Sequence, residues 1–183
     1  QKLMLKEESA IIGGNTSIAL GTCGTPTLST GASGGSLTAA TYYVRCVALT
    51  YEGYRNSSIA NGVATTQTIT GADGLTYVLK GGSSAISSEA SQAITGTQTL
   101  RMAVTAINGA VAYAWFVGSS SGSGNQYLQA ITAINSYELT TTPVTTTQAS
   151  NATGITSDNS QNTLAFDGLL TQGFNTGSGA YIK

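Results

Sequence analysis

Residues 41–50 read TYYVRCVALT, a stretch rich in β-branched and aromatic residues. Within it, Tyr42, Val44, Cys46 and Ala48 alternate with their neighbours and therefore share one side at a period of two. Strands favour such residues because these side chains pack well on a pleated, half-buried surface. The stretch predicts a β-strand with one side turned toward a core.

Short stretches with the same character follow along the chain. Residues 51–54 predict a turn, and residues 58–70 predict a Thr-rich alternating strand. A second turn at residues 71–74 precedes another predicted strand at residues 75–79. Residues 81–91 are rich in Ser and Gly, which is typical of a loop or a sheet edge.

The second half of the β region contains a hairpin signal. Residues 99–107 place four apolar side chains on one face, namely Leu100, Met102, Val104 and Ala106. An Asn-Gly turn at residues 108–109 follows, so we expect this stretch to pair with residues 111–117. The latter stretch is apolar on both faces, as a central strand would be, and Trp115 is expected to fill the core. Two further strands are predicted at residues 127–134 and 137–142.

Seven or eight short strands with turn signals every eight to twelve residues predict an all-β fold, most simply an antiparallel β-sandwich. An up-and-down barrel is the alternative, because the number of strands does not distinguish closure from two packed sheets. A chain of 183 residues has room for one such core but hardly for a second full domain.

The two ends of the chain differ from the β region. Residues 3–12 predict a short helix that ends at the Gly-Gly-Asn of residues 13–15. We therefore divide the chain into an N-terminal arm with a short helix (1–22), a β-sandwich module (23–145), and a polar linker with a C-terminal arm (146–183). Apolar residues in both arms suggest a parent domain into which the module is inserted. The charged opening of the sequence is expected of a segment cut from a longer polypeptide.

The composition excludes several partners. Only 8% of the residues are charged, and seven basic residues over the whole length cannot form the cationic surface that nucleic acid requires. The sequence contains no run of about eighteen apolar residues, so no membrane span is expected. We therefore predict neither nucleic acid nor membrane among the partners.

The residues needed for catalysis are scarce. The chain has no His, which removes the commonest general base and the commonest zinc ligand. Its eight carboxylates are scattered, and those of residues 52 and 73 fall in predicted turns, so an acid–base pair is not expected. The Asp-containing stretch 158–162 holds one carboxylate, too few for a calcium site. We predict no enzyme, and no catalytic, cofactor-binding or metal-ligating residues.

Two features point to specific contacts. A disulfide between Cys23 and Cys46 would stabilise the fold by roughly 3 kcal/mol in the chain-entropy model; the alternative is two reduced, partly buried thiols. Tyr51, Tyr54 and Arg55 lie in or beside a predicted turn and could form a surface contact patch for a sugar or a protein neighbour. The alternative for these three residues is packing at the end of a strand.

Two stretches resemble a known class of module. Residues 34–53 read GGSLTAATYYVRCVALTYEG, and this string resembles the one that leads into and through a strand of fibronectin type III and related immunoglobulin-like domains. Residues 108–118, NGAVAYAWFVG, resemble another strand of the same domains. The resemblance covers about a third of the module and implies an immunoglobulin-like sandwich.

The flanks carry a second resemblance. Residues 7–15 and 166–172 are similar to segments of tailed-phage virion proteins, in particular major capsid proteins with inserted immunoglobulin-like domains. This resemblance implies a structural role in the virion, assembled in the bacterial cytoplasm, with other copies or neighbouring virion proteins as partners and host-surface glycans as a further candidate. The chain is too short for a whole capsid fold. The alternative is a bacterial extracellular adhesin or carbohydrate-binding module at the cell surface.

Overall fold

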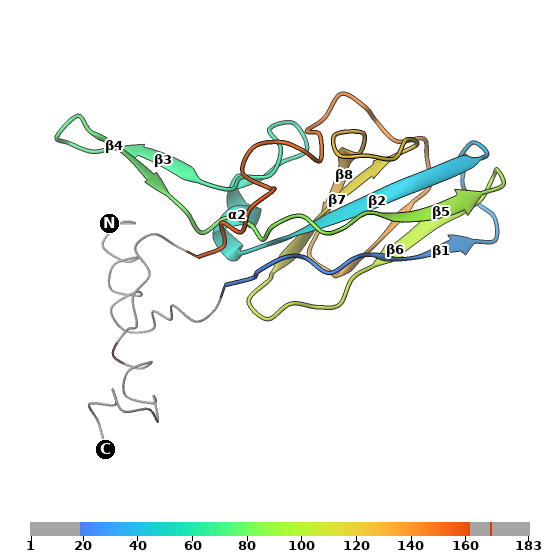
Figure 1. Cartoon of the computed structure of the whole chain (residues 1–183), viewed down its shortest axis with the longest axis horizontal. Coiled ribbons are helices and arrows are strands. Elements are labelled where there is room, and N and C mark those ends of the chain that lie inside the picture. Colours follow the sequence, from blue (N-terminus) through green and yellow to red (C-terminus); the bar gives the residue numbers. More distant parts are fainter. Residues whose placement is uncertain (1–18, 162–168, 170–183) are drawn as a thin grey trace, which may run out of the picture.

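The computed structural model describes residues 19–161 and Leu169. Residues 19–161 consist almost entirely of short strands joined by loops, as Figure 1 shows, with one short helix. The elements are β1 (Thr27–Gly31), β2 (Ala40–Leu49), α2 (Tyr51–Asn56), β3 (Gln67–Thr70), β4 (Thr76–Leu79), β5 (Ala90–Ile94), β6 (Thr99–Ala103), β7 (Ala112–Gly118), β8 (Tyr127–Thr132) and β9 (Ser136–Leu139).

Two antiparallel sheets form the body of the molecule. The first has three strands in the order β1-β6-β9, and the second has four strands in the order β5-β2-β7-β8. The strands β3 and β4 form a separate two-stranded hairpin. The predicted all-β, two-sheet architecture is therefore confirmed for the described residues.

The main core lies between the two sheets. Tyr42, Val44 and Cys46 of β2 meet Leu100 and Met102 of β6 there, as the alternation in both stretches predicts. Trp115 of β7 lies at the centre of this core and is fully buried. The period-two pattern thus identified the inward side chains of β2 and β6 correctly, but it was wrong for Ala106, which lies beyond the end of β6 and is exposed.

A second core covers the other face of the four-stranded sheet. Phe116 and Ala114 of β7 pack there against Leu128 of β8 and against Ile155, all of them fully buried. Strand β7 is consequently buried on both faces, which explains its unbroken apolar sequence.

Residue 155 belongs to the stretch that its composition predicted to be a linker. Instead, residues 146–160 lie on the sheet: the Leu128 N–H donates to Gln148 O (2.9 Å), and the Ile86 N–H donates to Ile155 O (2.7 Å). The stretch satisfies its backbone groups on the module while Ile155 supplies the apolar contact, so a polar composition did not imply an extended linker. The limits of the two arms stay a prediction.

The predicted hairpin of residues 99–107 and 111–117 is wrong. Strand β6 pairs with β1 and β9, whereas β7 pairs with β2 and β8 in the other sheet. The Asn-Gly turn does form, with the Ala110 N–H donating to Ile107 O (3.1 Å), but it carries the chain from one sheet to the other. Strand β6 thus finds sequence-distant partners, whereas β7 pairs with the distant β2 and with β8, the next strand along the chain.

Other local predictions were partly right. The turn at residues 71–74 joins β3 and β4 as expected, β8 falls within its predicted range, and β9 overlaps its predicted range but begins one residue earlier, at Ser136. Residues 51–54 are not a turn but the start of α2, and the strand predicted over residues 58–70 is limited to β3. The predicted helix of residues 3–12 lies outside the described residues. None of the helices in the described part is long and apolar enough to cross a membrane.

The described chain enters and leaves the body side by side, next to α2 (Figure 1). The Ser160 hydroxyl accepts a hydrogen bond from the Leu20 N–H (2.7 Å), and the Asp158 carboxylate accepts one from the Gly21 N–H (2.9 Å). Asp158 also accepts from the Ser160 hydroxyl (2.6 Å), which fixes both acceptors. We call these four residues the terminal clamp.

Candidate functional site

The predicted contact patch lies on helix α2. Tyr51, Tyr54 and Arg55 occupy positions i, i+3 and i+4, which share one face of a helix. The Tyr51 side chain is 59% exposed and that of Tyr54 is 42% exposed, and Arg55 is exposed as well. The structure therefore brings the three residues together on an open surface, rather than burying the tyrosines against a strand end. We call this surface the α2 face.

The helix is held at both ends. Thr50 is its N-cap: the hydroxyl oxygen accepts from the Gly53 N–H (3.1 Å) and the hydroxyl donates to Gly81 O. At the other end, the Ser57 hydroxyl donates to Gly53 O (2.6 Å) and accepts from the Ala64 N–H (2.8 Å). Such anchoring keeps a six-residue helix, too short to be stable alone, in one orientation.

Gly53 sets how closely the helix approaches the body. It is the buried residue of α2, and a Cβ built on it would collide with the carbonyl group of Gly82. Only the absence of a side chain allows the two backbones to lie in contact. Sequence reasoning assigned this glycine to a turn and missed its packing role.

Substitution Gly53→Ala is expected to push α2 away from residue 82 and to destabilise the fold by about 1–3 kcal/mol, the usual cost of overpacking. Thermal unfolding followed by circular dichroism measures the loss. Gly24→Ala is the matched control, since a Cβ there meets no atom within 4 Å. Equal melting temperatures for the two variants would contradict the close approach.

The two cysteines lie together in the main core. Cys23 and Cys46 are both buried, and the structure holds them as free thiols. A hydrogen bond from Cys46 lowers the pKa of Cys23, whereas burial raises the pKa of Cys46 well above its ordinary value. The two thiols therefore lie close enough to interact, and the disulfide between them stays a prediction.

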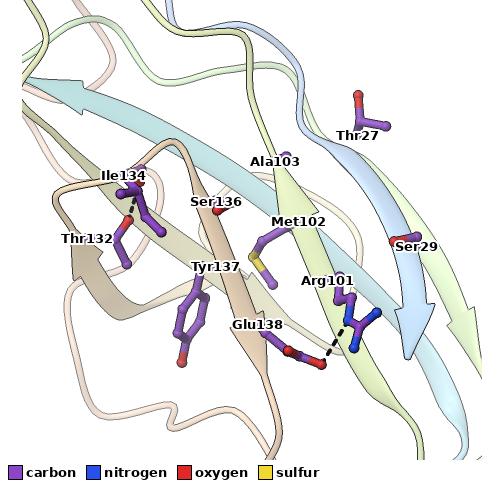
Figure 2. Close-up of a pocket in the computed structure, with 10 residues that line it drawn as sticks. All are labelled: Thr27, Ser29, Arg101, Met102, Ala103, Thr132, Ile134, Ser136, Tyr137 and Glu138. Carbon is purple, nitrogen blue, oxygen red and sulfur yellow. Dashed lines mark hydrogen bonds and ion pairs between the residues drawn. The ribbon is translucent and has the colours of Figure 1, made fainter. Parts of the chain in front are cut away.

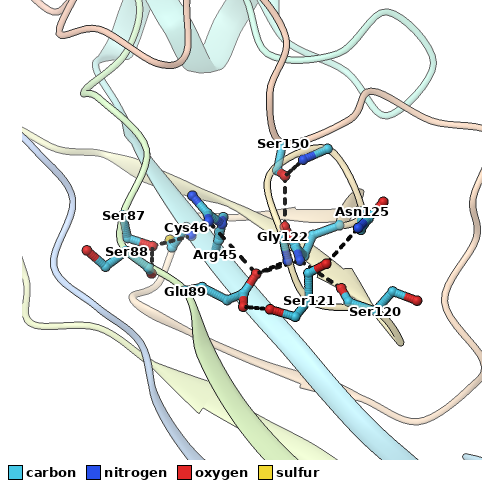
Figure 3. Close-up of polar contacts among 12 residues, drawn as sticks. Arg45, Cys46, Ser87, Ser88, Glu89, Ser120, Ser121, Gly122, Asn125 and Ser150 are labelled. Carbon is cyan, nitrogen blue, oxygen red and sulfur yellow. Dashed lines mark hydrogen bonds and ion pairs between the residues drawn. The ribbon is translucent and has the colours of Figure 1, made fainter.

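A polar network that the sequence did not reveal surrounds Glu89 (Figure 3). Its carboxylate accepts hydrogen bonds from the Ser121 hydroxyl (2.7 Å), the Gly122 N–H (3.0 Å) and the Gln126 amide (2.8 Å). The guanidinium of Arg45 lies 3.8 Å from the same carboxylate. Glu89 thereby anchors the polar turn after β7 to strand β2, and we call these five residues the Glu89 network. Glu89 is isolated in a polar stretch of the sequence, so no sequence signal singled it out.

Gln126 extends the Glu89 network toward residues 146–160. It is fully buried, and its amide oxygen accepts from the Ser150 hydroxyl (2.9 Å). The Ser150 hydroxyl oxygen in turn accepts from the Gly124 N–H (3.1 Å). The network thus joins the turn, the sheet and the segment that covers its second face.

A shallow groove of about 520 Å³ lies on the three-stranded sheet, shown in Figure 2. Strands β1, β6 and β9 line it, and Ile134 at its end is 63% exposed. The Arg101 and Glu138 side chains in the groove are joined at 3.0 Å, and the Thr99 hydroxyl also donates to Glu138 (2.5 Å). Arg101 and Glu138 therefore neutralise each other. The groove is a candidate contact surface.

These hydrogen bonds affect the pKa of Glu138. Donation by Thr99 and then by Arg101 lowers it from its ordinary value. A carboxyl with a depressed folded-state pKa contributes stability above its unfolded pKa of about 4.3, and that contribution is lost as the pH falls through the folded pKa.

We therefore expect Glu138→Gln to have a lower free energy of unfolding than wild type near neutral pH. Below about pH 4 the difference between the two proteins should become smaller, because wild type loses the contribution of the ionised carboxylate there. The effect is small, because the carboxyl is fully exposed. Urea denaturation of both proteins between neutral and acid pH measures it. If the difference in free energy of unfolding stays constant or grows in acid, the hydrogen bonds from Thr99 and Arg101 do not stabilise the ionised form of Glu138.

Metal ligation is a further use for clustered side chains. In residues 19–161 and at Leu169, no group of three His, Cys, Asp or Glu residues is placed to hold a metal ion.

Comparison of the chain with protein-family models, with curated proteins and with solved structures finds no match.

Proposed function

We propose that the chain is a structural, non-enzymatic part of a tailed-phage virion, in which an immunoglobulin-like module is inserted into a longer protein for assembly or surface display. The observation that carries the proposal is the terminal clamp, because it joins residues 20–21 to residues 158 and 160. A module whose ends lie side by side can be inserted into a loop of a parent domain without distorting that domain.

The strand order supports the immunoglobulin-like type. In such domains one sheet has the order C′-C-F-G and the other contains the neighbouring strands B and E. Strands β5-β2-β7-β8 follow the first order, and β1 and β6 are neighbours as B and E are. One departure is β9, which comes last among the described strands yet lies beside β6, where these domains place strand D.

A corner interaction supports the same type. Immunoglobulin-like domains have a Tyr near the start of strand F whose hydroxyl binds backbone a few residues upstream. Here the Tyr113 hydroxyl, near the start of β7, accepts from the Ile107 N–H (3.0 Å). The core departs from the antibody pattern, since Trp115 is on β7 and stands opposite Cys46 of β2. Both resembling strings, residues 34–53 and 108–118, cover the strands that match C and F.

The arrangement of charges supports a non-enzymatic role. Glu89 and Glu138 are each paired with an arginine, and Asp158 is engaged in the terminal clamp. The chain has no imidazole that could act beside them as a general base. The segments that resemble virion proteins, residues 7–15 and 166–172, lie outside the described residues except for Leu169, so this part of the proposal rests on the sequence.

Two experiments test the proposal. Residues 19–161, inserted into a surface loop of an unrelated enzyme, are expected to leave its activity intact, whereas an insert without the clamp (Asp158→Ala with Ser160→Ala) is expected to impair it. Immunogold electron microscopy of phage particles that encode the chain is expected to label the particle. Unlabelled particles would contradict the virion role, and loss of enzyme activity with the intact insert would contradict the insertion.

The α2 face favours a second candidate, a bacterial extracellular adhesin or carbohydrate-binding module. Two exposed tyrosines beside a guanidinium are suited to stacking on a sugar ring and hydrogen bonding to its hydroxyls. A glycan array tests this candidate with wild type and with Tyr51→Ala/Tyr54→Ala. The control is Ile134→Ala, on the exposed groove of the three-stranded sheet. Binding lost only in the double variant, together with unlabelled phage particles, would favour this candidate over the virion role.

A further inference from the structure

The hairpin of β3 and β4 projects away from the body of the molecule (Figure 1). Among the described residues, neither strand pairs with any strand but the other, so each has an open outer edge. Leu75 is 60% exposed and Val78 is 55% exposed on this hairpin. Apolar side chains are thus held in solvent on an arm with two open sheet edges.

Such an arm is unusual on its own. An isolated two-stranded hairpin is at best marginally stable in water, and natural edge strands are protected by Lys, Pro or bulges within the strand. Neither β3 (QTIT) nor β4 (TYVL) contains a charge or a proline. The edges are therefore suited to accept a further strand through backbone hydrogen bonds.

The alternation of hydrogen-bonded pairs in the hairpin determines which backbone N–H and C=O groups of β4 face outward. The Gly71 N–H donates to Leu75 O (2.9 Å), and bonded pairs recur at every second position of an antiparallel ladder. The pairs 69/77 and 67/79 then use their backbone groups within the hairpin. The N–H and C=O groups of Thr76 and Val78 point outward, toward any strand that joins.

We infer that this edge pairs with the β4 strand of a second copy of the chain, antiparallel and centred on Tyr77. In this two-fold register Thr76 of each copy exchanges hydrogen bonds with Val78 of the other. The exposed Val78 side chain then packs beside Thr76 of the second copy. The pairing satisfies the outward backbone groups and covers exposed apolar surface.

The charges at the two ends of β4 favour a second copy in this orientation. Asp73 precedes the strand and Lys80 follows it. Antiparallel pairing centred on Tyr77 places Lys80 opposite Gly74 of the second copy, beside that copy's Asp73. Parallel pairing would instead bring like charges together at both ends, which is destabilising. The charges at the two ends of β4 are thus complementary to those of a second copy in the antiparallel orientation only.

The inference deepens the proposed assembly role and rests on it. One hairpin edge buries far less than the roughly 1,000 Å² typical of a stable interface, so isolated copies would associate weakly. In an array of copies the effective concentration is much higher, and a weak contact becomes significant.

Sedimentation equilibrium of the whole chain tests the pairing at concentrations up to about 1 mM, where contacts worth only about 4 kcal/mol become visible. The variant is Val78→Pro, which removes an outward N–H and is tolerated at an edge. The matched control is Thr68→Pro, at the paired position of β3, whose N–H faces outward on the other edge. We expect a weak dimer for wild type and Thr68→Pro, and at least tenfold weaker association for Val78→Pro.

Three results would overturn the pairing: a monomeric wild type at the highest concentration, an unchanged dimer in Val78→Pro, or equal loss in both variants. Circular dichroism of each variant shows that it is folded. Lys80→Glu gives an independent readout, since it is expected to weaken the dimer and to reverse its sensitivity to salt. These outcomes are separate from the proposed virion role: labelled particles with no effect of Val78→Pro would overturn the pairing alone, and a dimer with unlabelled particles would overturn the virion role alone.

Discussion

Replacement of Trp115 by alanine is expected to destabilise the protein by about 3–5 kcal/mol. The residue is fully buried between the two sheets, where its ring lies 6.5 Å from that of Tyr137. Its indole N–H donates to the Thr132 hydroxyl (2.8 Å). Truncation would therefore leave a cavity in the main core and remove a hydrogen bond between neighbouring strands.

Urea denaturation at equilibrium measures this loss. Val111→Ala is the control, because Val111 lies just before the same strand and is 40% exposed, so its truncation is expected to cost less than about 0.5 kcal/mol. A loss below about 1 kcal/mol for Trp115→Ala would mean that the core tolerates removal of its largest side chain.

The Glu89→Ala variant is expected to lose about 2–3 kcal/mol, because hydrogen bonds to charged groups are worth more than neutral ones. The substitution removes three hydrogen bonds at once and leaves the guanidinium of Arg45, with a side chain only 19% exposed, without its carboxylate. The NH₂ group of the buried Gln126 amide would keep only its bond to Ser120 O. The expected result is a less stable module with a loosened turn after β7.

Two measurements separate these effects. Urea denaturation gives the total loss, and hydrogen exchange at the Gly122 amide reports on the turn, since that N–H donates to Glu89. Glu89→Gln is the informative control: its one amide oxygen can still accept from Gly122 and Gln126, and its NH₂ group can donate to the Ser121 hydroxyl, but the charge is removed. Its loss of stability should therefore be smaller than that of Glu89→Ala. Equal losses in both variants would assign the whole effect to the pairing with Arg45.

The sequence predicted the strands and the inward side chains well because both follow from local alternation. Tyr42, Val44 and Met102 are all buried as their spacing requires. Strand pairing was harder to predict, since the Asn-Gly turn at residues 108–109 is equally suited to join two strands of one sheet or to cross between two sheets. Which of the two occurs depends on partners that lie far away in the chain.

The sequence predicted which residues make up the contact patch, but not the helix on which they lie. Tyr51, Tyr54 and Arg55 were identified by residue type, but the helix that aligns them depends on the Thr50 cap and on the contact between Gly53 and residue 82. The Glu89 network depends on residues from three separate segments, and no single stretch of sequence contains it. Ile155 is one apolar residue among polar ones, so its burial could not be read from local composition.

The terminal clamp also determines how the module would respond to tension. A force applied through the two ends of the described chain would act first on the hydrogen bonds of Leu20 and Gly21, which would open one after the other like a zipper. The ladders of the two sheets would carry none of that force while the clamp holds. The module is thus suited to project from a protein that bears force, and unsuited to transmit that force through its own two ends.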